Sequence, residues 1–292
     1  MKNNVLYLRV TVGHYENFPV ASLLLPATLR NPVAVIYRFA RSADDIADEG
    51  DDTPAARIAK LQAYRDALQR LARPETPLFA DVARIVREHD LPLSLFHDLL
   101  DAFAQDVVKK RYATFTEVLD YCRRSANPVG RLLLHLFKRT SETELAQSDA
   151  ICTALQLINF WQDVAIDYAK NRIYLPQDEM AVYGVSEAQI GAQRCNADFS
   201  GLMGAQVRRS RELMLRGAPL GASLPGRIGL EIRATVQGGL RVLEKIERAG
   251  YDVFRRRPAL MWYDWSLVLA RALPKSGSDP NRGKPGSDPG GV

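Results

Sequence analysis

The stretch FARSADDIADEGDD, residues 39–52, places three aspartates, Asp44, Asp45 and Asp48, in a segment that is otherwise apolar and helix-like. Residues four apart lie on one face of a helix, so the side chains of Asp44 and Asp48 are expected to project together. Two like charges on one face destabilise a helix slightly unless a cation lies between them. The stretch is therefore either a solvated helix end followed by an acidic turn, or half of a site that binds a metal ion and a diphosphate.

A second pair with the same spacing, Asp163 and Asp167, occurs in QLINFWQDVAIDYAKNRIYLP, residues 156–176. The residues before Asp163 are apolar nearly all round, which predicts a helix that is buried on most sides. A buried carboxylate pair needs compensation, and a divalent cation provides it. Magnesium prefers oxygen ligands and typically takes one or two carboxylates together with substrate phosphate oxygens. Two such helices facing each other predict a metal–diphosphate site.

Both aspartate pairs have an arginine nearby. Arg41 stands three residues before Asp44, and Arg172 stands five residues after Asp167. The planar guanidinium group is suited to phosphate because it donates paired, charge-assisted hydrogen bonds. A single pair of aspartates at this spacing is more often an ordinary solvated helix face, but two pairs with arginines favour the binding site.

The composition limits the compartment and the partners. The net charge of +5 and the pI near 9.1 are modest, so they do not require nucleic acid, and they fit anionic small substrates or a membrane surface equally well. The three cysteines include no CxxC pair, which argues against a disulfide framework and a zinc site. The sequence shows neither a signal-peptide pattern nor a long uninterrupted apolar run. We expect a cytoplasmic protein, and peripheral contact with the inner membrane is an open alternative.

Apolar residues recur at three- and four-residue spacing, as in Leu95, Leu99 and Phe103, whereas alternation with a period of two is rare. The pattern predicts an all-α fold. We expect one catalytic domain over residues 1–273 and a disordered tail, rich in Gly, Pro and Ser, over residues 274–292. The predicted helices number about ten and cover residues 19–30, 33–50, 54–72, 78–90, 92–110, 115–138, 144–170, 186–217, 227–250 and 258–273.

Three motifs taken together resemble the squalene/phytoene synthase family, the head-to-head trans-isoprenyl diphosphate synthases. They are YRFARSADDIADE (residues 37–49), YCRRSANPVG (residues 121–130) and the second aspartate motif, and the resemblance spans about His14 to Arg257. It implies a single-domain isoprenoid-synthase helical bundle with a central substrate cavity between the two DxxxD helices.

The resemblance also implies roles for individual residues. Catalysis would involve Asp44, Asp48, Asp163, Asp167, Tyr121 and Tyr37. The Mg²⁺ ligands would be Asp44, Asp45, Asp48, Asp163 and Asp167. Substrate contacts would come from Arg41, Arg172, Gln156, Asn159, His14, Phe18, Tyr174 and Arg256. Alternatives stay open for some of these: Tyr174 and Phe18 can equally be core residues, and Arg256 can belong to a basic surface cluster, Arg255–Arg257.

Within the family, HYENFPVASLLLP (residues 14–26), SANPVG and NFWQDV (residues 159–164) are similar to the branch of bacterial hopanoid pathways that converts presqualene diphosphate to hydroxysqualene. This likeness implies Mg²⁺-dependent ionisation and rearrangement of presqualene diphosphate, followed by capture of water. No NADPH is expected, and no GxGxxG dinucleotide motif is present. Glu16 or Asn17 would orient the water.

Other reactions of the family remain alternatives: head-to-head condensation of two farnesyl diphosphates to presqualene diphosphate or squalene, or a phytoene- or dehydrosqualene-type synthesis. Glu16 stands where many relatives carry a basic or small polar residue, and Gln162 stands where many carry an arginine. This loss of positive charge puts the two-substrate condensation in doubt. A non-catalytic assembly protein with this fold is a third possibility, but it would be expected to lack the aspartates.

The resemblance implies several partners. They are a prenyl diphosphate substrate, a presqualene diphosphate synthase upstream and a reductase downstream, and no nucleic acid is expected. The segment Pro258–Leu273 carries Trp262, Tyr263 and Trp265 beside apolar residues. It is either the closing helix of the bundle or an interfacial helix that docks on a bilayer.

Overall fold

The computed structural model describes residues 25–255 and 257–273, and within these residues the chain is helical without a β-strand, apart from one isolated bridge between Arg111 and Ile173. The all-α prediction is therefore confirmed. The helices are α1 (Ala27–Asp48), α2 (Pro54–Gln69), α3 (Pro77–His89), α4 (Leu93–Val108), α5 (Phe115–Ser125), α6 (Asn127–Leu136), α7 (Glu142–Gln162), α8 (Val164–Ala169), α9 (Gln177–Val182), α10 (Glu187–Gly191), α11 (Ala197–Gly217), α12 (Leu220–Ser223), α13 (Gly226–Arg248) and α14 (Asp264–Ala272).

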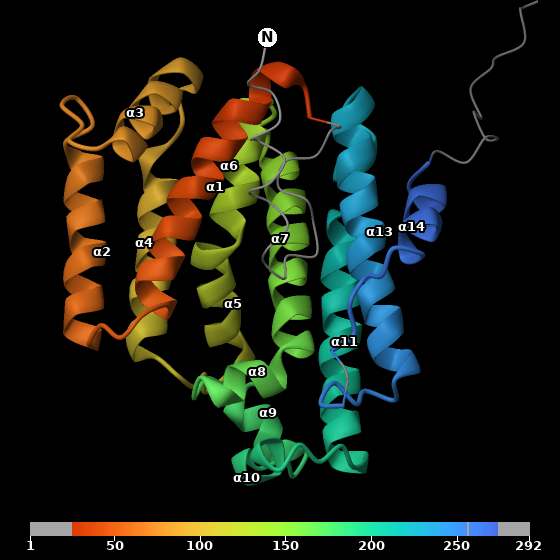
Figure 1. The fold of residues 1–292 in the computed structure, drawn as a ribbon. Coiled ribbons are helices and arrows are strands. Elements are labelled where there is room, and N and C mark those ends of the chain that lie inside the picture. Colours follow the sequence, from red (N-terminus) through yellow and green to blue (C-terminus); the bar gives the residue numbers. More distant parts are fainter. Residues whose placement is uncertain (1–24, 256, 274–292) are drawn as a thin grey trace, which may run out of the picture.

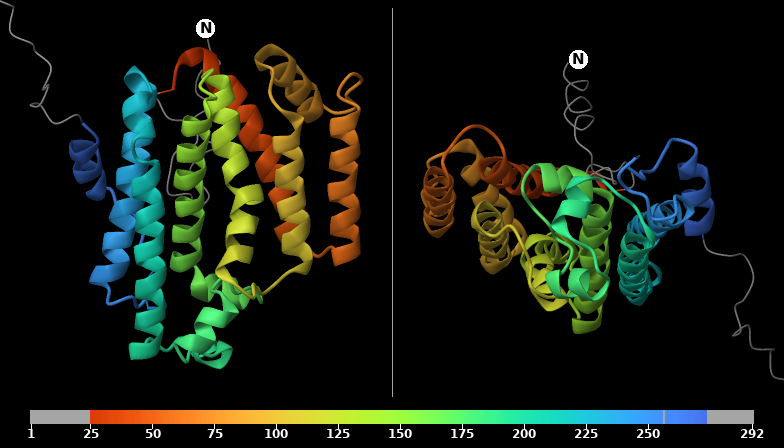
Figure 2. Two further views of the ribbon diagram at one scale, coloured as in Figure 1. Left: turned by 180° about the vertical axis from the view of Figure 1, so that it is seen from behind. Right: turned by 90° about the horizontal axis from the view of Figure 1, so that it is seen from below.

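The long helices run alongside one another as a bundle, and α7 lies in the middle of it (Figure 1). Helix α7 packs against α5 and α6 on one side and against α11 and α13 on the other (Figure 2). The short helices α8, α9 and α10 lie together at the lower end of the bundle in Figure 1. The C-terminal ends of α1 and α7, which carry the aspartate motifs, both point toward this lower end.

The interior consists of two large apolar clusters. One is built mainly by α7, α11 and α13 together with residues of the short helices at the lower end of the bundle. The other is built by α1 to α4 with part of α6. Trp161 of α7 is fully buried in the first cluster, where its indole Nε1 donates a hydrogen bond of 2.8 Å to Ser210 Oγ of α11. A buried Trp needs such a partner because an N–H group without a hydrogen bond is costly in an apolar environment. The apolar run before Asp163 is thus a core helix, as its sequence predicts.

Two predicted helix boundaries are wrong for reasons that concern proline. The segments 19–30 and 33–50 were predicted as separate helices, but α1 continues from Ala27 through Pro32 to Asp48. Pro32 removes a single backbone hydrogen bond near the start of a long helix, which the rest of the helix tolerates. The segment 115–138 was predicted as one helix, but it is divided at Ala126, just before Pro128 begins the first turn of α6.

Other predicted helices are divided or shortened. The segment 144–170 separates into α7 and α8 at Asp163, and the segment 186–217 separates into α10 and α11. Of the segment 258–273, only Asp264–Ala272 is helical. Helix α9 was not predicted because its six residues are too few to show a helical period. The predicted tail, residues 274–292, lies outside the described residues, so it stays a prediction.

None of the helices over the described ranges is long and apolar enough to cross a membrane.

Candidate active site

The first aspartate motif lies on one face of α1. Tyr37, Arg41, Asp44 and Asp48 follow one another at intervals of three or four residues, so they share this face, and Asp48 is the last residue of the helix. The guanidinium group of Arg41 lies 3.1 Å from Asp44 Oδ2 and 2.8 Å from Asp45 Oδ1. Arg41 thus contacts two of the three aspartates of its own motif.

The second motif lies across a helix break. Gln156, Asn159 and Asp163 share a half-buried face of α7, and α7 ends immediately before Asp163. The backbone N–H of Asp167 donates to the carbonyl oxygen of Asp163 at 2.8 Å, so the helical spacing of the two aspartates persists through the break. Asp163 is therefore the capping residue between the two helices, directly after the end of α7 and directly before the start of α8.

Arg172 joins the two motifs. Its backbone N–H donates to the carbonyl oxygen of Asp167 at 2.8 Å. Its guanidinium group forms a bidentate pair with Asp48, in which Nη1 lies 2.9 Å from Oδ2 and Nη2 contacts Oδ1. Both side chains of this pair are largely buried. One arginine therefore holds the end of α1 against the loop that follows α8.

The carboxylates of the site differ in how well their charge is compensated. Burial raises the pKa of Asp44 to about 7, with a further contribution from the charge of Asp48. Burial, and then the charge of Asp163, raise the pKa of Asp167 to about 8. Burial acts in the same direction on Asp48, but the hydrogen bond and charge of Arg172 outweigh it and lower the pKa of Asp48. At Asp44 and Asp167 the nearby cations, Arg41 for the first and Arg172 with Lys170 for the second, do not outweigh burial and the neighbouring carboxylates.

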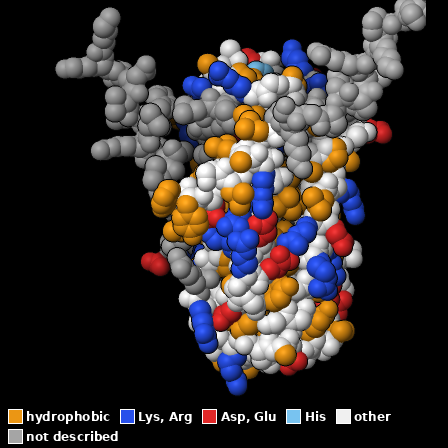
Figure 3. Space-filling model, turned by 90° about the vertical axis from the view of Figure 1, so that its right-hand side faces the viewer, with side chains coloured by type: hydrophobic (Ala, Val, Ile, Leu, Met, Phe, Trp, Pro, Cys, Tyr) orange, Lys and Arg blue, Asp and Glu red, His pale blue; other side chains and the backbone are white. Residues whose placement is uncertain are grey.

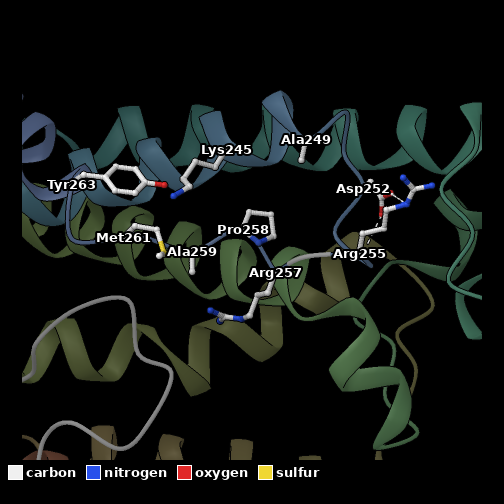
Figure 4. A pocket seen from close by; sticks show the side chains of 9 residues that line it. All are labelled: Lys245, Ala249, Asp252, Arg255, Arg257, Pro258, Ala259, Met261 and Tyr263. Atoms are coloured by element: carbon white, nitrogen blue, oxygen red, sulfur yellow. Dashed lines mark hydrogen bonds and ion pairs between the residues drawn. The ribbon is translucent and has the colours of Figure 1, made fainter.

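The C-terminal arginine cluster reaches the second motif through Arg257. Its Nη2 lies 3.0 Å from Asp163 Oδ2, and its Nε contacts the other carboxylate oxygen. Figure 4 shows Arg257 among the residues that line a cleft of about 340 Å³ between the C-terminal part of α13 and the segment that follows it. Arg256, the residue that the sequence resemblance indicated, lies outside the described residues. Sequence reasoning missed Arg257 because three consecutive arginines cannot be told apart by spacing alone.

Asp106 of α4 is a second residue that sequence reasoning missed. It is 5% exposed, and its carboxylate accepts hydrogen bonds from the hydroxyl groups of Tyr121, at 2.5 Å, and Tyr174, at 3.2 Å. Its backbone carbonyl oxygen accepts from Arg172 Nη2 at 3.3 Å. A signal was available, because Asp106 continues the buried face of Leu99 and Phe103 at helical spacing. A lone aspartate on such a face needs partners.

Tyr121 and Tyr174 are core residues as well as neighbours of the site. The rings of Tyr174 and Phe160 stack with centroids 3.7 Å apart, and Tyr121 packs against both rings. Burial and then the charge of Asp106 raise the pKa of both tyrosines well above 10, so their hydroxyl groups remain protonated and act as donors. The two tyrosines and Asp106 form a buried, hydrogen-bonded group next to Arg172.

The remaining residues that the sequence analysis singled out have less direct contacts with the aspartate motifs or lie outside the described residues. Tyr37 and Gln156 are half-buried on their helices. Gln162 is fully buried, and its amide donates to the carbonyl oxygen of Pro258. It therefore connects α7 with the C-terminal segment. His14, Phe18, Glu16 and Asn17 lie outside the described residues.

The donor set fits a divalent cation only if the substrate completes the coordination. Within residues 25–255 and 257–273, no three carboxylate, imidazole or thiol groups converge into a ready-made metal site. Each motif does offer a pair of carboxylates, and burial together with the neighbouring carboxylate raises the pKa values of Asp44 and Asp167. Magnesium commonly takes one or two carboxylates and fills its remaining positions with water and phosphate oxygens. The residues that could hold the metal are Asp44, Asp45, Asp48, Asp163 and Asp167.

Comparisons with known proteins agree with the motifs and the fold. Residues 11–264 match the profile of the family described as squalene/phytoene synthase. The hydroxysqualene synthase of Rhodopseudomonas palustris is 38% identical over 226 residues, which cover 74% of each chain, and that of Zymomonas mobilis is 36% identical over 225 residues, which cover 75% of each chain. The crystal structure of squalene synthase HpnC from Alicyclobacillus acidocaldarius superposes with a TM-score of 0.77 at 35% identity, covering 84% of this chain and 93% of that chain. This chain therefore belongs to the squalene/phytoene synthase family.

Proposed function

We propose that this chain converts presqualene diphosphate to hydroxysqualene and diphosphate with the help of Mg²⁺. In this reaction the carbon–oxygen bond to the diphosphate breaks, the leaving group keeps the electron pair, and the cyclopropylcarbinyl cation rearranges. Water then adds to the rearranged cation and loses a proton, so no hydride donor such as NADPH is required. Support comes from the two relatives named hydroxysqualene synthase, which align over about three quarters of the chain.

The observation that carries the proposal is the joining of the two aspartate motifs by Arg172. A leaving diphosphate gathers negative charge, and preorganised donors that meet this charge lower the barrier to its departure. When bound, Mg²⁺ would act as a Lewis acid that stabilises the same charge. Arg41 and Arg172 would donate to phosphate oxygens, while Asp44 and Asp167, whose charge is poorly compensated, would hold the cation.

Asp106 and its tyrosines would act on Arg172. The carbonyl oxygen of Asp106 accepts from the guanidinium group, and the carboxylate fixes Tyr121 and Tyr174 behind it. A guanidinium group held in this way loses little freedom when it meets a diphosphate, so more of the binding energy remains for the leaving group.

The test is an incubation of the purified protein with Mg²⁺ and presqualene diphosphate, in parallel with farnesyl diphosphate, without NADPH, with products identified by mass spectrometry. We expect hydroxysqualene from presqualene diphosphate and its loss in Asp44→Asn and Asp163→Asn. Asp81→Asn is a matched control, because within the described residues Asp81 pairs with Arg38 and Arg84, whose side chains are partly exposed, and contacts neither aspartate motif. Conversion of farnesyl diphosphate to presqualene diphosphate would instead support condensation. If neither substrate gave a product, the result would contradict an enzymatic role.

The same proposal implies neighbours in a reaction sequence. A synthase must supply presqualene diphosphate, and a reductase must remove the hydroxyl group if squalene is the end product. Both substrate and product carry long hydrocarbon chains, which partition into bilayers. We propose that the protein contacts the inner membrane peripherally for this reason.

The segment before and within α14 supports the membrane proposal. Trp262 is 84% exposed, and Tyr263, Leu269 and Leu273 are exposed as well. Figure 3 looks onto this side of the molecule and shows apolar side chains beside Lys and Arg. Tyr and Trp favour the boundary between water and acyl chains. In liposome flotation we expect Trp262→Ser to reduce binding, and equal flotation of the variant and the parent chain would reject this contact.

A further inference from the structure

A second cleft, of about 300 Å³, lies beside the aspartate motifs. We name it the Lys110 cleft after one of its lining residues, and its charged lining consists of Arg57, Lys110, Lys170, Arg172, Asp48 and Asp52. It opens between the C-terminal ends of α1 and α4, the start of α2 and the loop after α8. It shares Asp48 and Arg172 with the aspartate motifs, whereas Asp44, Asp163 and Asp167 do not line it.

The lining of the Lys110 cleft has an excess of positive charge. It contains four cationic side chains and two carboxylates, and both carboxylates are already engaged. Asp48 is taken by the bidentate pair with Arg172, and Asp52 is bound by Lys60, which is not part of the lining. Lys170 Nζ lies 3.5 Å from Asp48, so it shares a carboxylate that is already paired.

Lys110 contacts the backbone of α4 through its ammonium group. Its ammonium group donates at 2.5 Å to the backbone carbonyl oxygen of Asp106, the same oxygen that accepts from Arg172 at 3.3 Å. Over the part of the chain that the structure describes, Lys110 forms no ion pair with a carboxylate. Burial and the nearby charge of Arg172 lower the pKa of Lys110, as expected where two cations crowd one oxygen.

Arg57 and Arg172 supply further donors. Arg57 donates to the carbonyl oxygens of Ile46, Gly50 and Asp52 at 2.7–3.1 Å, which fixes its guanidinium group at the end of α1. These contacts use three of the five N–H groups that a guanidinium group carries. Among the residues that the structure describes, no carboxylate forms an ion pair with Arg57. Arg172, at 8% exposure, has a buried Nε that lacks a hydrogen-bond partner within the described residues.

We propose that the Lys110 cleft binds inorganic diphosphate after it has left the carbon skeleton, as an exit subsite next to the reaction centre. The identity of this ligand rests on the proposed function, because the diphosphate is the leaving group of that reaction. A diphosphate carries several negative oxygens, and a concave site with an ammonium group and two fixed guanidinium groups is complementary to it. Arg172 faces both the cleft and Asp48, so the leaving group can pass from one set of donors to the next without losing contact with cations.

The test is isothermal titration of the full chain with inorganic diphosphate in EDTA, without any prenyl substrate. Without a divalent cation the aspartate motifs repel diphosphate, so binding under this condition reports on the Lys110 cleft. We expect measurable binding, and Lys110→Gln should raise the dissociation constant about tenfold, because a charge-assisted hydrogen bond is lost. Lys109→Gln is the matched control, since the neighbouring Lys109 pairs with Glu117 at 2.9 Å and does not line the cleft.

A second variant keeps the proposal open to refutation if Lys110→Gln folds poorly. Lys170 is half exposed, so Lys170→Gln should fold and should also weaken diphosphate binding. In turnover assays with Mg²⁺, product inhibition by diphosphate should weaken in Lys110→Gln while the KM for the prenyl diphosphate rises less than twofold. Binding that appears only with Mg²⁺, or a KM that rises in parallel with the inhibition constant, would overturn the proposal. The titration in EDTA uses no prenyl substrate, so it gives its result even if the reaction differs from the one proposed.

Discussion

Replacement of Asp106 by Asn is predicted to change how the stability of the protein depends on pH. Asp106 is buried under Tyr121, Tyr174 and Arg172. Burial raises its pKa to about 6, although the hydrogen bond from Tyr121 and the charge of Arg172 act in the opposite direction. A rise from the ordinary value of 3.8 to about 6 corresponds to about 3 kcal/mol of preference for the neutral carboxyl group in the folded state.

The sign follows from the protonation of the two states. Above pH 6 the carboxyl group is charged in both the folded and the unfolded chain, and the folded chain bears the full cost of burying that charge. Between pH 6 and 3.8 the folded chain takes up a proton before the unfolded chain does, so the contribution of this group to stability grows as the pH falls. Asn resembles the neutral carboxyl group in shape and carries no titratable proton, so the variant should lack this dependence.

The assay is urea unfolding followed by circular dichroism, from about pH 7.5 to about pH 4.5, for the parent chain and for Asp106→Asn. We expect the difference in unfolding free energy between the two chains to change by about 2 kcal/mol over this range, in favour of the parent chain at low pH. Tyr121→Phe removes a hydrogen bond to the charged form, so it should move the midpoint of the change to higher pH. A difference that is constant across the range would refute the reasoning.

Three further predictions concern other parts of the molecule. Arg172→Gln leaves the largely buried carboxylate of Asp48 without its bidentate partner, so we expect a loss of about 3 kcal/mol in urea unfolding, whereas Arg38→Gln, which breaks an exposed pair with Asp81, should cost less than about 0.5 kcal/mol. Gly217→Ala would bring a Cβ to 2.5 Å from the backbone oxygen of Gln147, so α11 and α7 would have to separate, and the melting temperature should fall by several degrees in calorimetry, by about 2 kcal/mol of stability. Burial would raise the pKa of Asp264, but contacts with Lys245, the Met261 N–H and Arg241 outweigh it and lower the pKa to about 2. These contacts contribute about 2.5 kcal/mol of stability, which is complete above pH 3.8 and is lost as the pH falls toward 2. In urea unfolding, Asp264→Asn should therefore be less stable at neutral pH, and its stability should change less between pH 3.8 and pH 2 than that of the parent chain.

The sequence was sufficient to predict most of the fold because helical periodicity is a local signal. The faces that carry Asp44 with Asp48 and Asn159 with Asp163 follow from spacing alone. The position of Asp163 at a helix break did not follow, because the break depends on how the short α8 packs at the end of the bundle, where it contacts α10.

Tertiary contacts were the part that the sequence could not supply. Arg172 was expected near phosphate, but its pair with Asp48 spans 124 residues, and spacing does not reveal such a partner. Asp106 was missed because its role depends on two tyrosines from α5 and from the segment after α8. The contact between Arg257 and Asp163 likewise depends on where the chain turns after α13.

Helix α14 has a consequence for the local dynamics of the protein. It packs mainly against α13, through a small cluster formed by Val268, Ala272 and Ala234, and it is fastened there by Asp264. An element with so few buried neighbours opens by local unfolding at a fraction of the global free energy, so its amide protons should exchange with solvent long before those of α7. Because the segment that carries Arg257 leads directly into α14, each such opening would loosen one partner of Asp163 while the rest of the bundle stays folded.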